Sequence, residues 1–385
     1  MNKNCHIGRS FVYSRQEKDV QRHNIGKYQC NECFIAQKLP LQFMIDSNIL
    51  IKGDNLLGLQ WLLDNGYEGK IDLIYIDPPF ATGNSFGIDK TGRVATISRS
   101  TDAITAYSDF RKGKIFIEWL RARVRLMHRL LSEKGSFYLH IDYKTGHYVR
   151  VMLDEIFGMN NFRNDITRIK CSPKNFHRVG YGNIKDVIFF YSKSETPVWN
   201  DVQIPCSDED IAKRYTKIDS KGRRYTTVPI HAPGETKSGK TGSCFKGIYP
   251  SKGRHWRCPV EELEKLDEQG LIEWSKNGNP RKINYADKHL TKKQQDIWYY
   301  KDPVYPIYPT EKNLDMLKYI VANSSNPDSV VLDCFCGSGS TLYAAQTLGR
   351  QWIGIDQSEI AIDVTKKRIG QRNLFNSVPY YYIEL

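Results

Sequence analysis

The clearest structural signal in this chain is Ile71-Asp-Leu-Ile-Tyr-Ile-Asp-Pro-Pro-Phe80. Its first six residues are mostly apolar and β-prone, which predicts a strand buried on both faces, as in a parallel sheet. Two consecutive prolines then prevent the strand from continuing and favour extended geometry at Asp77 and Pro78. The sequence therefore predicts that Asp77 is held rigidly at the carboxyl end of a strand, where open α/β sheets bind their ligands.

The residues Asp77, Pro78, Pro79 and Phe80 suit a planar base that carries an exocyclic amine. The Asp77 carboxylate and the Pro78 carbonyl can accept hydrogen bonds from the amine, while the Phe80 ring stacks on the base. The alternative interpretation is a strand that ends in a Pro-Pro turn with a capping aspartate. These four residues leave both interpretations open, and the carboxyl-terminal part of the chain weakens the second.

A second pattern lies at Ser329-Val-Val-Leu-Asp-Cys-Phe-Cys-Gly-Ser-Gly-Ser-Thr-Leu342. It predicts a buried strand that ends at Asp333, a glycine-rich turn, and a helix that begins at Ser340 or Thr341. The next predicted strand ends at Asp356, about 20 residues after the glycines, as in nucleoside-binding βαβ units. There the glycines let the backbone approach the ligand, and the acid holds ribose hydroxyls. The three-glycine dinucleotide spacing is absent, although a dinucleotide stays open at this point.

Strands and helices alternate along the rest of the chain, which predicts an α/β sheet. Residues 48–63 read as a strand, a turn and a helix capped by Asp54 or Asn55, and Asp54 is also a candidate ligand contact. Residues 81–110 lack clear periodicity, which predicts a loop that closes over the bound base. Further helices are predicted at 115–131, 148–157, 260–269, 308–321 (with Thr310 as its N-cap) and 358–371, and further strands at 136–142, 166–170, 186–192 and 351–356.

The charge of the chain favours a polyanionic partner, because the net charge is +13 and the pI is about 9.1. Residues 160–300 hold 26 Lys and Arg against 17 Asp and Glu, which is +9 of that excess. Basic residues alternate there with aromatics and amides, which predicts a DNA-reading insertion; an irregular surface insertion is the alternative. The candidate DNA contacts are Arg223, Arg224, Arg254, Trp256, Arg257, Arg281 and Lys282.

Composition predicts a cytoplasmic protein. No apolar run approaches the roughly 18 residues of a membrane span, the first residues do not begin a secretory signal, and nine cysteines without regular spacing fit a reducing compartment. Cys30 and Cys33, with Cys5, His6 and His23 upstream, form only half of a zinc site. We therefore predict ordinary thiols and no metal.

The two motifs together, Asp77-Pro-Pro-Phe80 and Asp333-Cys-Phe-Cys-Gly-Ser-Gly339, resemble the amino-methyltransferases of bacterial restriction–modification systems. Their order is similar to that of the β-class, in which the catalytic motif precedes the cofactor motif on a circularly permuted, Rossmann-like methyltransferase fold. The similarity extends from about residue 48 to residue 372, and the segment Tyr308-Pro-Thr-Glu-Lys312 is similar to the one before the family's glycine loop. It implies an N-terminal extension (1–47), a catalytic half (48–160), an inserted target-recognition region (161–300) and a cofactor-binding half (301–385).

The resemblance implies a site-specific enzyme that transfers a methyl group from S-adenosylmethionine to adenine N6 of a flipped-out base in duplex DNA. Asp77, Pro78, Pro79 and Phe80 would form its catalytic set, although many relatives carry Tyr at position 80. The resemblance assigns Asp333, Phe335, Gly337, Gly339 and Asp356 to the cofactor, with Asp356 on the ribose. The predicted cofactor set adds Asp54, Asp77, Cys336, Ser338 and Thr341.

Adenine is expected because the motif begins with Asp77, whereas the similar cytosine-N4 enzymes more often begin with Ser. Cytosine-N4 methylation is the alternative, and a catalytically silent DNA-binding protein on the same fold is the rival from another class. Duplex DNA is the expected partner. A cognate restriction endonuclease and a homodimer stay open, and neither a metal nor a membrane is required.

Overall fold

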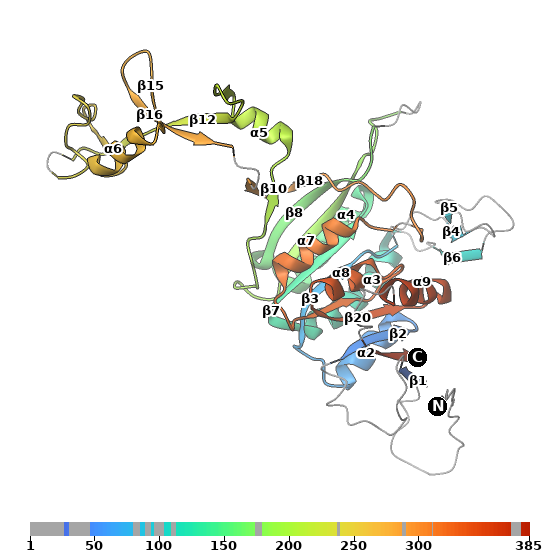
Figure 1. Cartoon of the computed structure of the whole chain (residues 1–385). Helices are drawn as coiled ribbons and strands as arrows, with labels where there is room; N and C mark the ends of the chain where they lie inside the picture. Colours follow the sequence, from blue (N-terminus) through green and yellow to red (C-terminus); the bar gives the residue numbers. More distant parts are fainter. Residues whose placement is uncertain are drawn as a thin grey trace, which may run out of the picture. The chain divides into compact units, whose positions relative to one another are not determined.

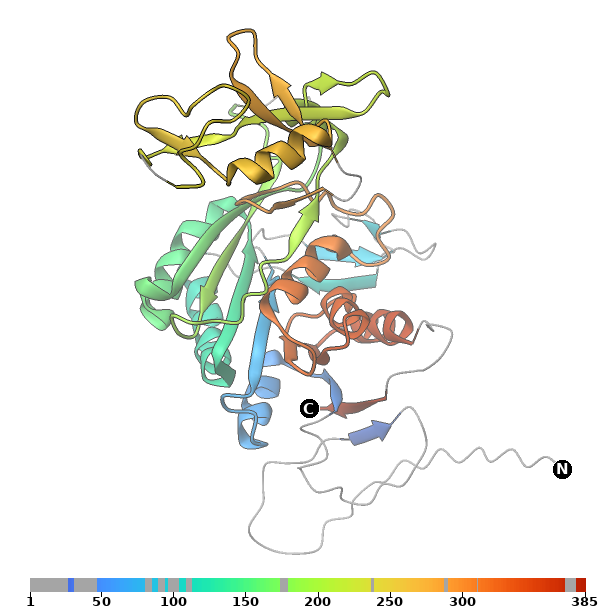
Figure 2. The same cartoon turned by 60° about the vertical axis from the view of Figure 1, so that its left-hand side comes forward.

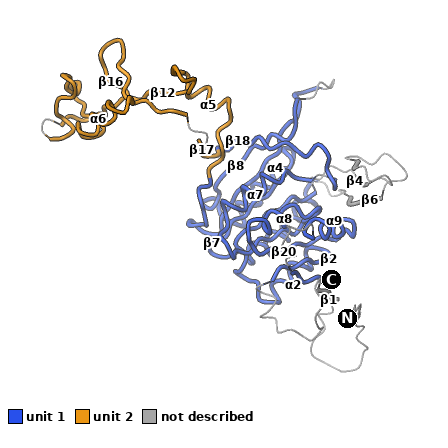
Figure 3. The backbone as a smooth tube through the Cα atoms, viewed as in Figure 1, with its two compact units in different colours: residues 1–202, 295–385 blue, residues 203–294 orange. Residues whose placement is uncertain are grey.

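The computed structural model describes residues 47–79, 113–173, 179–236, 239–286, 290–309, 311–370 and 379–385 in full, and only the backbone of strands at 27–30, 85–88, 94–95 and 104–108. The chain divides into two compact units (Figure 3): unit 1 comprises Met1–Val202 and Gln295–Leu385, and unit 2 comprises Gln203–Gln294. Unit 2 is shorter than the predicted insertion at 161–300, because strands β8 (Phe162–Ile169) and β9 (Lys185–Ser192) pair within the large sheet of unit 1.

Unit 1 is built on a sheet whose ten described strands run in the order β1-β21-β2-β20-β19-β3-β7-β9-β8-β18 (Figure 1). Neighbouring strands are parallel from β21 to β7, while β9 is antiparallel to both β7 and β8. This confirms the predicted, mostly parallel α/β sheet. The remaining strands are β1 (Lys27–Cys30), β2 (Asn48–Lys52), β3 (Ile71–Ile76), β7 (Leu131–Ile141), β18 (Ile297–Trp298), β19 (Val330–Asp333), β20 (Gln351–Asp356) and β21 (Tyr380–Glu384).

Helices cover both faces of this sheet, because its central strands are apolar on both sides. Ile49 and Ile51 of β2 pack into one cluster of buried residues, and Leu50 between them packs into the other. The first cluster contains α2 (Asn55–Asp64), α3 (Gly113–Leu130) and α4 (Tyr143–Phe157), and the second contains α7 (Leu314–Ser324), α8 (Ser340–Thr347) and α9 (Glu359–Ile369). Figure 2 shows the blue-to-green helices and the orange-to-red helices on opposite sides of the strands.

The strand register brings the predicted site residues to one edge of the sheet. Lys52 pairs with Asp356, Asp333 pairs with Gly354, and Leu332 pairs with Ile74, so β2, β20, β19 and β3 end side by side. Because these strands are parallel, their carboxyl ends share one edge. Asp54, Asp356, Asp333 and Asp77 therefore stand at or just beyond the ends of four adjacent strands.

Two local predictions are wrong. The segment predicted as a loop at 81–110 contains a three-stranded antiparallel sheet of β4 (Ser85–Ile88), β5 (Val94–Ala95) and β6 (Ile104–Ser108); its other residues, and Phe80, lie outside the described residues. Helix α7 begins at Leu314 rather than at residue 308, because the Asn313 side chain caps it by accepting a hydrogen bond from the Met316 N–H at 3.1 Å.

Two further predictions, the Thr310 N-cap and the ordinary thiols near the N-terminus, concern residues that are not described in full. Thr310 lies outside the described residues, as do Cys5, His6, His23 and Cys33, and Cys30 is described only by its backbone. Within the described residues, no helix combines the length and apolarity that a bilayer crossing requires.

Unit 2 carries a small core of its own, made by Ile230, Phe245, Trp256 and Leu263. A four-stranded antiparallel sheet in the order β11-β12-β16-β15 and the hairpin β13–β14 accompany helix α6. Its described elements are β10 (Gln203–Pro205), α5 (Asp208–Arg214), β11 (Lys217–Ile218), β12 (Arg224–Pro229), β13 (His231–Pro233), β14 (Arg254–Trp256), α6 (Val260–Glu268), β15 (Ile272–Trp274), β16 (Pro280–Tyr285) and β17 (Thr291–Lys293).

Candidate active site

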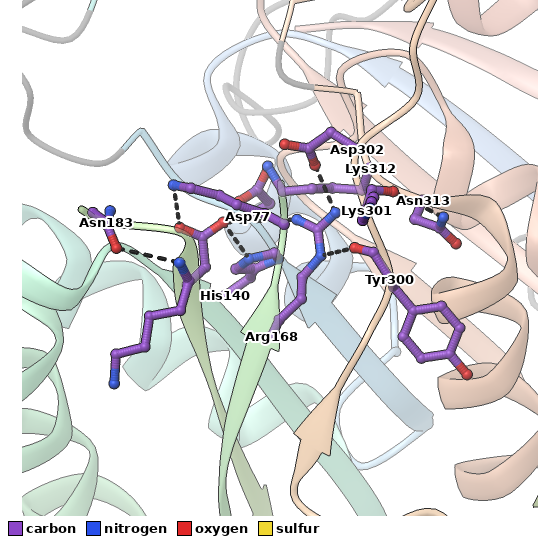
Figure 4. A network of polar contacts seen from close by, with 12 residues as sticks. Asp77, His140, Arg168, Asn183, Tyr300, Lys301, Asp302, Lys312 and Asn313 are labelled. Carbon is purple, nitrogen blue, oxygen red and sulfur yellow. Dashed lines mark hydrogen bonds and ion pairs between the residues drawn. The ribbon is translucent and has the colours of Figure 1, made fainter. Parts of the chain in front are cut away.

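Asp77 forms the centre of the site and is paired with a lysine from a distant part of the chain. The Lys312 ammonium lies 2.6 Å from Asp77 Oδ2, and the two side chains are only 9% and 16% exposed (Figure 4). The other oxygen, Oδ1, is buried and has no hydrogen-bond partner among the described residues. Because a buried acceptor without a donor is costly, this oxygen is suited to a ligand that brings an N–H.

The glycine-rich loop after β19 is shaped by two aspartates. Asp333 Oδ1 accepts a hydrogen bond from the Phe335 N–H at 3.0 Å. Asp356 accepts from the Gly337 N–H at 2.9 Å through Oδ2, and from the Ser358 N–H at 2.9 Å through Oδ1. The end of β20 is therefore bonded directly to the loop. Since each carboxylate oxygen has a second lone pair, a ribose contact at Asp356 stays a prediction.

Glycine is required in this loop for two reasons. Gly337 and Gly339 have φ angles of 50° and 72°, in the left-handed region that other residues rarely adopt. A Cβ at Gly339 would also lie 2.8 Å from Thr365 side-chain atoms. Thr365 in turn donates a hydrogen bond to the Gly337 carbonyl at 2.9 Å, so α9 and the loop are in direct contact.

The remaining predicted cofactor residues of the loop point into the structure. Cys336, Ser338 and Thr341 are buried, and Phe335 is half-buried. The Ser338 hydroxyl lies 3.0 Å from the Ser340 hydroxyl, and the Thr341 hydroxyl bonds to the Asp333 carboxylate. These contacts stabilise the shape of the loop, and the roles of these residues toward a cofactor stay predictions.

The site holds more buried negative than positive charge. Burial, together with the nearby carboxylates of Asp77 and Asp356, raises the pKa of Asp333 to about 7. Burial also raises the pKa of Asp356. Lys312 pairs with Asp77, whereas Asp333 and Asp356 accept hydrogen bonds from backbone N–H groups and form no ion pair among the described residues. This excess favours a cationic ligand, and S-adenosylmethionine carries a sulfonium and an ammonium.

Arg123 is a component of the site that sequence reasoning missed. It is 4% exposed, and its NH2 group lies 3.2 and 3.1 Å from the two carboxylate oxygens of Asp54. Its Nε donates to Asn55 Oδ1 at 2.5 Å, and the Asn55 amide donates to the Cys334 carbonyl at 2.9 Å. Asp54 also caps α2, as predicted, by accepting from the Leu56 N–H. The sequence signal was an arginine on the apolar face of a basic helix.

A buried polar network continues the same edge beyond Asp77 (Figure 4) and was likewise missed. His140 Nδ1 lies 2.9 Å from the Tyr75 hydroxyl, and its Nε2 lies 3.3 Å from Asp186 Oδ2. Burial lowers the pKa of His140. Burial opposes ionisation of Asp186, but the hydrogen bond with His140 and the positive charges of Lys170 and Lys312 outweigh it and lower the pKa of that carboxyl.

The predicted DNA contacts fall on unit 2 and differ in exposure. Arg223, Arg224, Arg254 and Arg257 are exposed, whereas Arg281 and Lys282 are half-buried. The Arg281 guanidinium donates to the Thr227 hydroxyl at 2.9 Å and to its carbonyl at 2.7 Å. The prediction for Trp256 is wrong: this residue is 2% exposed and donates its indole N–H to the Ser243 carbonyl at 2.8 Å. Trp256 is a core residue of unit 2.

Comparison with known proteins defines the class. The model of the N6/N4 DNA methylase family matches residues 71–367, and the chain belongs to this family. The family match confirms the predicted methyltransferase fold class and the predicted cofactor, S-adenosylmethionine. The protein is accordingly a DNA methyltransferase of the N6/N4 type.

Curated relatives include other DNA methyltransferases and a subunit of a restriction–modification enzyme. The chain is 42% identical to the type II methyltransferase M.EcaI of Enterobacter cloacae, over 92% of this chain and 74% of that protein. It is 26% identical to the StyLTI Mod subunit, a type III restriction–modification enzyme of Salmonella typhimurium, over 79% of this chain and 50% of that subunit. It is 23% identical to the DNA adenine methyltransferase YhdJ of Escherichia coli K12, over 86% of this chain and 85% of that protein.

Solved structures with detectable similarity include M1.HpyAVI in complex with SAM, at a TM-score of 0.41 and 17% identity, over 83% of this chain and 99% of that chain. Another is the cytosine-N4-specific PvuII DNA methyltransferase, at a TM-score of 0.44 and 14% identity, over 86% of this chain and 89% of that chain.

Proposed function

We propose that this protein methylates N6 of adenine in duplex DNA, with S-adenosylmethionine as methyl donor, as the modification enzyme of a restriction–modification or epigenetic system. The observation that carries the proposal is the buried Asp77 Oδ1, an acceptor without a partner among the described residues, at the start of the Asp77-Pro-Pro motif. An exocyclic amine would supply the missing donor. Aspartate at the head of the motif favours adenine, and a relative named as a DNA adenine methyltransferase supports that choice.

The chain's own groups act mainly by positioning. The target base must leave the duplex, because its amine is paired and stacked there, and extrusion costs a few kcal/mol. The amine lone pair is delocalised into the ring, so hydrogen bonds to Asp77 Oδ1 and the Pro78 carbonyl would localise it on the nitrogen. Holding the two reactants in a near-attack geometry then supplies most of the acceleration.

S-adenosylmethionine supplies the sulfonium methyl group that the nitrogen attacks. The residues that would hold it are the backbone of Gly337–Gly339 and the carboxylates of Asp333 and Asp356. The positive φ angles of Gly337 and Gly339 and the excess of buried carboxylates suit this ligand. Asp54 belongs to the same edge of the sheet, and its contact with Arg123 gives it a supporting role there.

Unit 2 is the proposed target-recognition region. It carries 19 Lys and Arg against 12 Asp and Glu, a net charge of +7. Arg223, Arg224, Arg254 and Arg257 are exposed on it, and such side chains contact phosphates and base edges. A cognate restriction endonuclease and a homodimer both stay predictions.

The test is modification sequencing of single DNA molecules from a methylation-free host that expresses the protein, with the Asp77→Ala variant in the same host as control. N6-methyladenine at one short motif, absent from the control, is the expected result. Detection of N4-methylcytosine instead would contradict adenine methylation and favour the cytosine-N4 alternative. An unmodified genome, with S-adenosylmethionine still bound by the purified protein, would contradict DNA methylation and favour the silent DNA-binding protein.

A further inference from the structure

We propose that Lys312 is a positioning residue that orients the Asp77 carboxylate toward the amine of the target base. The inference rests on the proposed function and adds to it the group that determines which carboxylate oxygen faces the substrate. Nothing in the Asp77-Pro-Pro motif itself fixes the carboxylate, which is free to rotate about its Cβ–Cγ bond. The contact with Lys312 removes that freedom.

The geometry separates the two oxygens of Asp77 by role. Oδ2 lies 2.6 Å from the Lys312 ammonium, a short, charge-assisted contact between two largely buried groups. Oδ1 is buried and has no hydrogen-bond partner among the described residues. One oxygen is therefore held by the protein, and the other lacks a hydrogen-bond donor, which a ligand could supply. Because the pair is partly desolvated, the contact is stronger than a surface ion pair and less screened by salt.

Lys312 is itself fixed by the residues on both sides of it. Glu311 pairs with Arg368 of α9, both side chains being 12% exposed, and it accepts from the Ile307 N–H at 2.8 Å. On the other side Asn313 caps α7 and donates to the Lys301 carbonyl at 2.9 Å. A lysine between two anchored neighbours loses less freedom on pairing than an exposed one.

The same segment contacts the cofactor loop. Arg368, the partner of Glu311, donates to the Ser338 hydroxyl at 3.1 Å and also to the Ser340 hydroxyl. The Tyr308 ring lies against Gly337, with a ring carbon 3.4 Å from the position that a Cβ would occupy. Consecutive residues, Glu311 and Lys312, thus connect the glycine loop to Asp77. One short piece of chain therefore contacts both the cofactor loop and Asp77.

Lysine suits this role better than arginine. An ammonium bonds one carboxylate oxygen as a point charge, whereas a guanidinium fork matches both oxygens of a carboxylate at once. An arginine at position 312 would therefore compete with the amine for Oδ1. Lysine and arginine would neutralise the Asp77 carboxylate equally well, but they would orient it differently. Comparing the two residues at position 312 therefore distinguishes a positioning role from simple charge neutralisation.

The experiment measures single-turnover methyl transfer from tritiated S-adenosylmethionine to genomic DNA of a methylation-free host. Lys312→Met should lower the rate about 100-fold, the cost of a small misplacement of a reacting group. Calorimetry should show S-adenosylmethionine affinity, and filter binding should show DNA affinity, within about threefold of wild type. Lys312→Arg should recover less than about a tenth of the lost rate, because its fork covers both oxygens.

Lys193→Met is the matched control, since the Lys193 ammonium makes an equally short contact, 2.6 Å to the His128 carbonyl, at the end of β9 that pairs with the start of β7 and so lies away from the carboxyl edge. Its rate should stay within about threefold of wild type. Wild-type rates in Lys312→Met, or a loss explained entirely by weaker cofactor binding or by unfolding, would overturn the inference. Full recovery in Lys312→Arg would overturn it in favour of neutralisation. A wild-type protein that transfers no methyl group would instead contradict the proposed function.

Discussion

The carboxyl edge of the large sheet and the surface of unit 2 use charge in opposite ways. At the sheet edge, Asp77, Asp333 and Asp356 are largely buried, and each is held by a lysine or by backbone N–H groups. On unit 2, Arg254 and Arg257 are exposed within a region of net charge +7. Buried groups feel a low dielectric and keep one orientation, so they serve chemistry. Exposed cations are screened, so they serve attraction to a polyanion.

The largest expected effect is on the rate of methyl transfer, when Asp77 at the carboxyl edge of the large sheet is replaced. Asp77→Ala should lower methyl transfer by about 1000-fold, as loss of one preorganised hydrogen-bonding group does in other enzymes. Calorimetric affinity for S-adenosylmethionine should be nearly intact. The matched control is Asp72→Ala, on the same strand but at its other end, where the carboxylate accepts from the Ser132 hydroxyl at 2.9 Å and from the Val330 N–H at 3.1 Å. Equal loss of activity and cofactor binding in Asp77→Ala would remove the role assigned to it.

A smaller effect, on cofactor affinity, is expected for Asp356, which holds the glycine-rich loop in shape. Asp356→Ala leaves the N–H groups of Gly337 and Ser358 without their acceptor, so the loop should lose its shape. We expect S-adenosylmethionine affinity to fall about 10- to 100-fold, equivalent to about 1.4 to 2.7 kcal/mol, while duplex DNA binding persists. Asp363→Ala, on the exposed face of α9, is the control. Unchanged cofactor affinity in Asp356→Ala would separate this residue from the cofactor site.

Charge removal on unit 2 should act on DNA binding and not on the chemical step. Arg254→Ala and Arg257→Ala should each weaken DNA binding severalfold and reduce the slope of log affinity against log salt by about 1. The single-turnover rate at saturating DNA should not change. Lys265→Ala, on the acidic helix α6, is the control from the same unit. A salt slope that stays constant in both arginine variants would place the DNA surface elsewhere.

The last prediction concerns the stability of the protein without cofactor. The pKa of Asp333 is raised from 3.8 to about 7 in the folded protein, so between these values the native state holds a proton that the unfolded chain has released. This group therefore lowers the free energy of unfolding as pH rises from about 4 to 7, by at most about 1.4 kcal/mol per pH unit. Urea titrations from pH 5 to 8 should show Asp333→Asn gaining stability over wild type as pH rises to 7. A pH-independent difference would mean that Asp333 is already ionised.

The sequence was most informative where local chemistry dictates local structure. Apolar β-prone residues followed by two prolines predicted β3 and the position of Asp77, and the glycine turn after Asp333 predicted the loop with φ angles of 50° and 72°. The sequence was least informative where the role of a residue depends on whether its side chain is buried. Trp256 belongs to a basic, aromatic stretch but lies in the core of unit 2. Composition does not show which aromatic residues a small unit needs for its own core.

The two motifs, their order and the strand ends that carry Asp77, Asp333 and Asp356 could be predicted before folding, because strand, turn and helix signals extend over only a few residues. The folded structure was needed to show that Lys312 pairs with Asp77, that Arg123 pairs with Asp54, and that β8 and β9 belong to the large sheet. These contacts join residues far apart in the chain. They depend on which side chains the packed sheet and helices bring together, and short-range sequence patterns do not predict such long-range contacts.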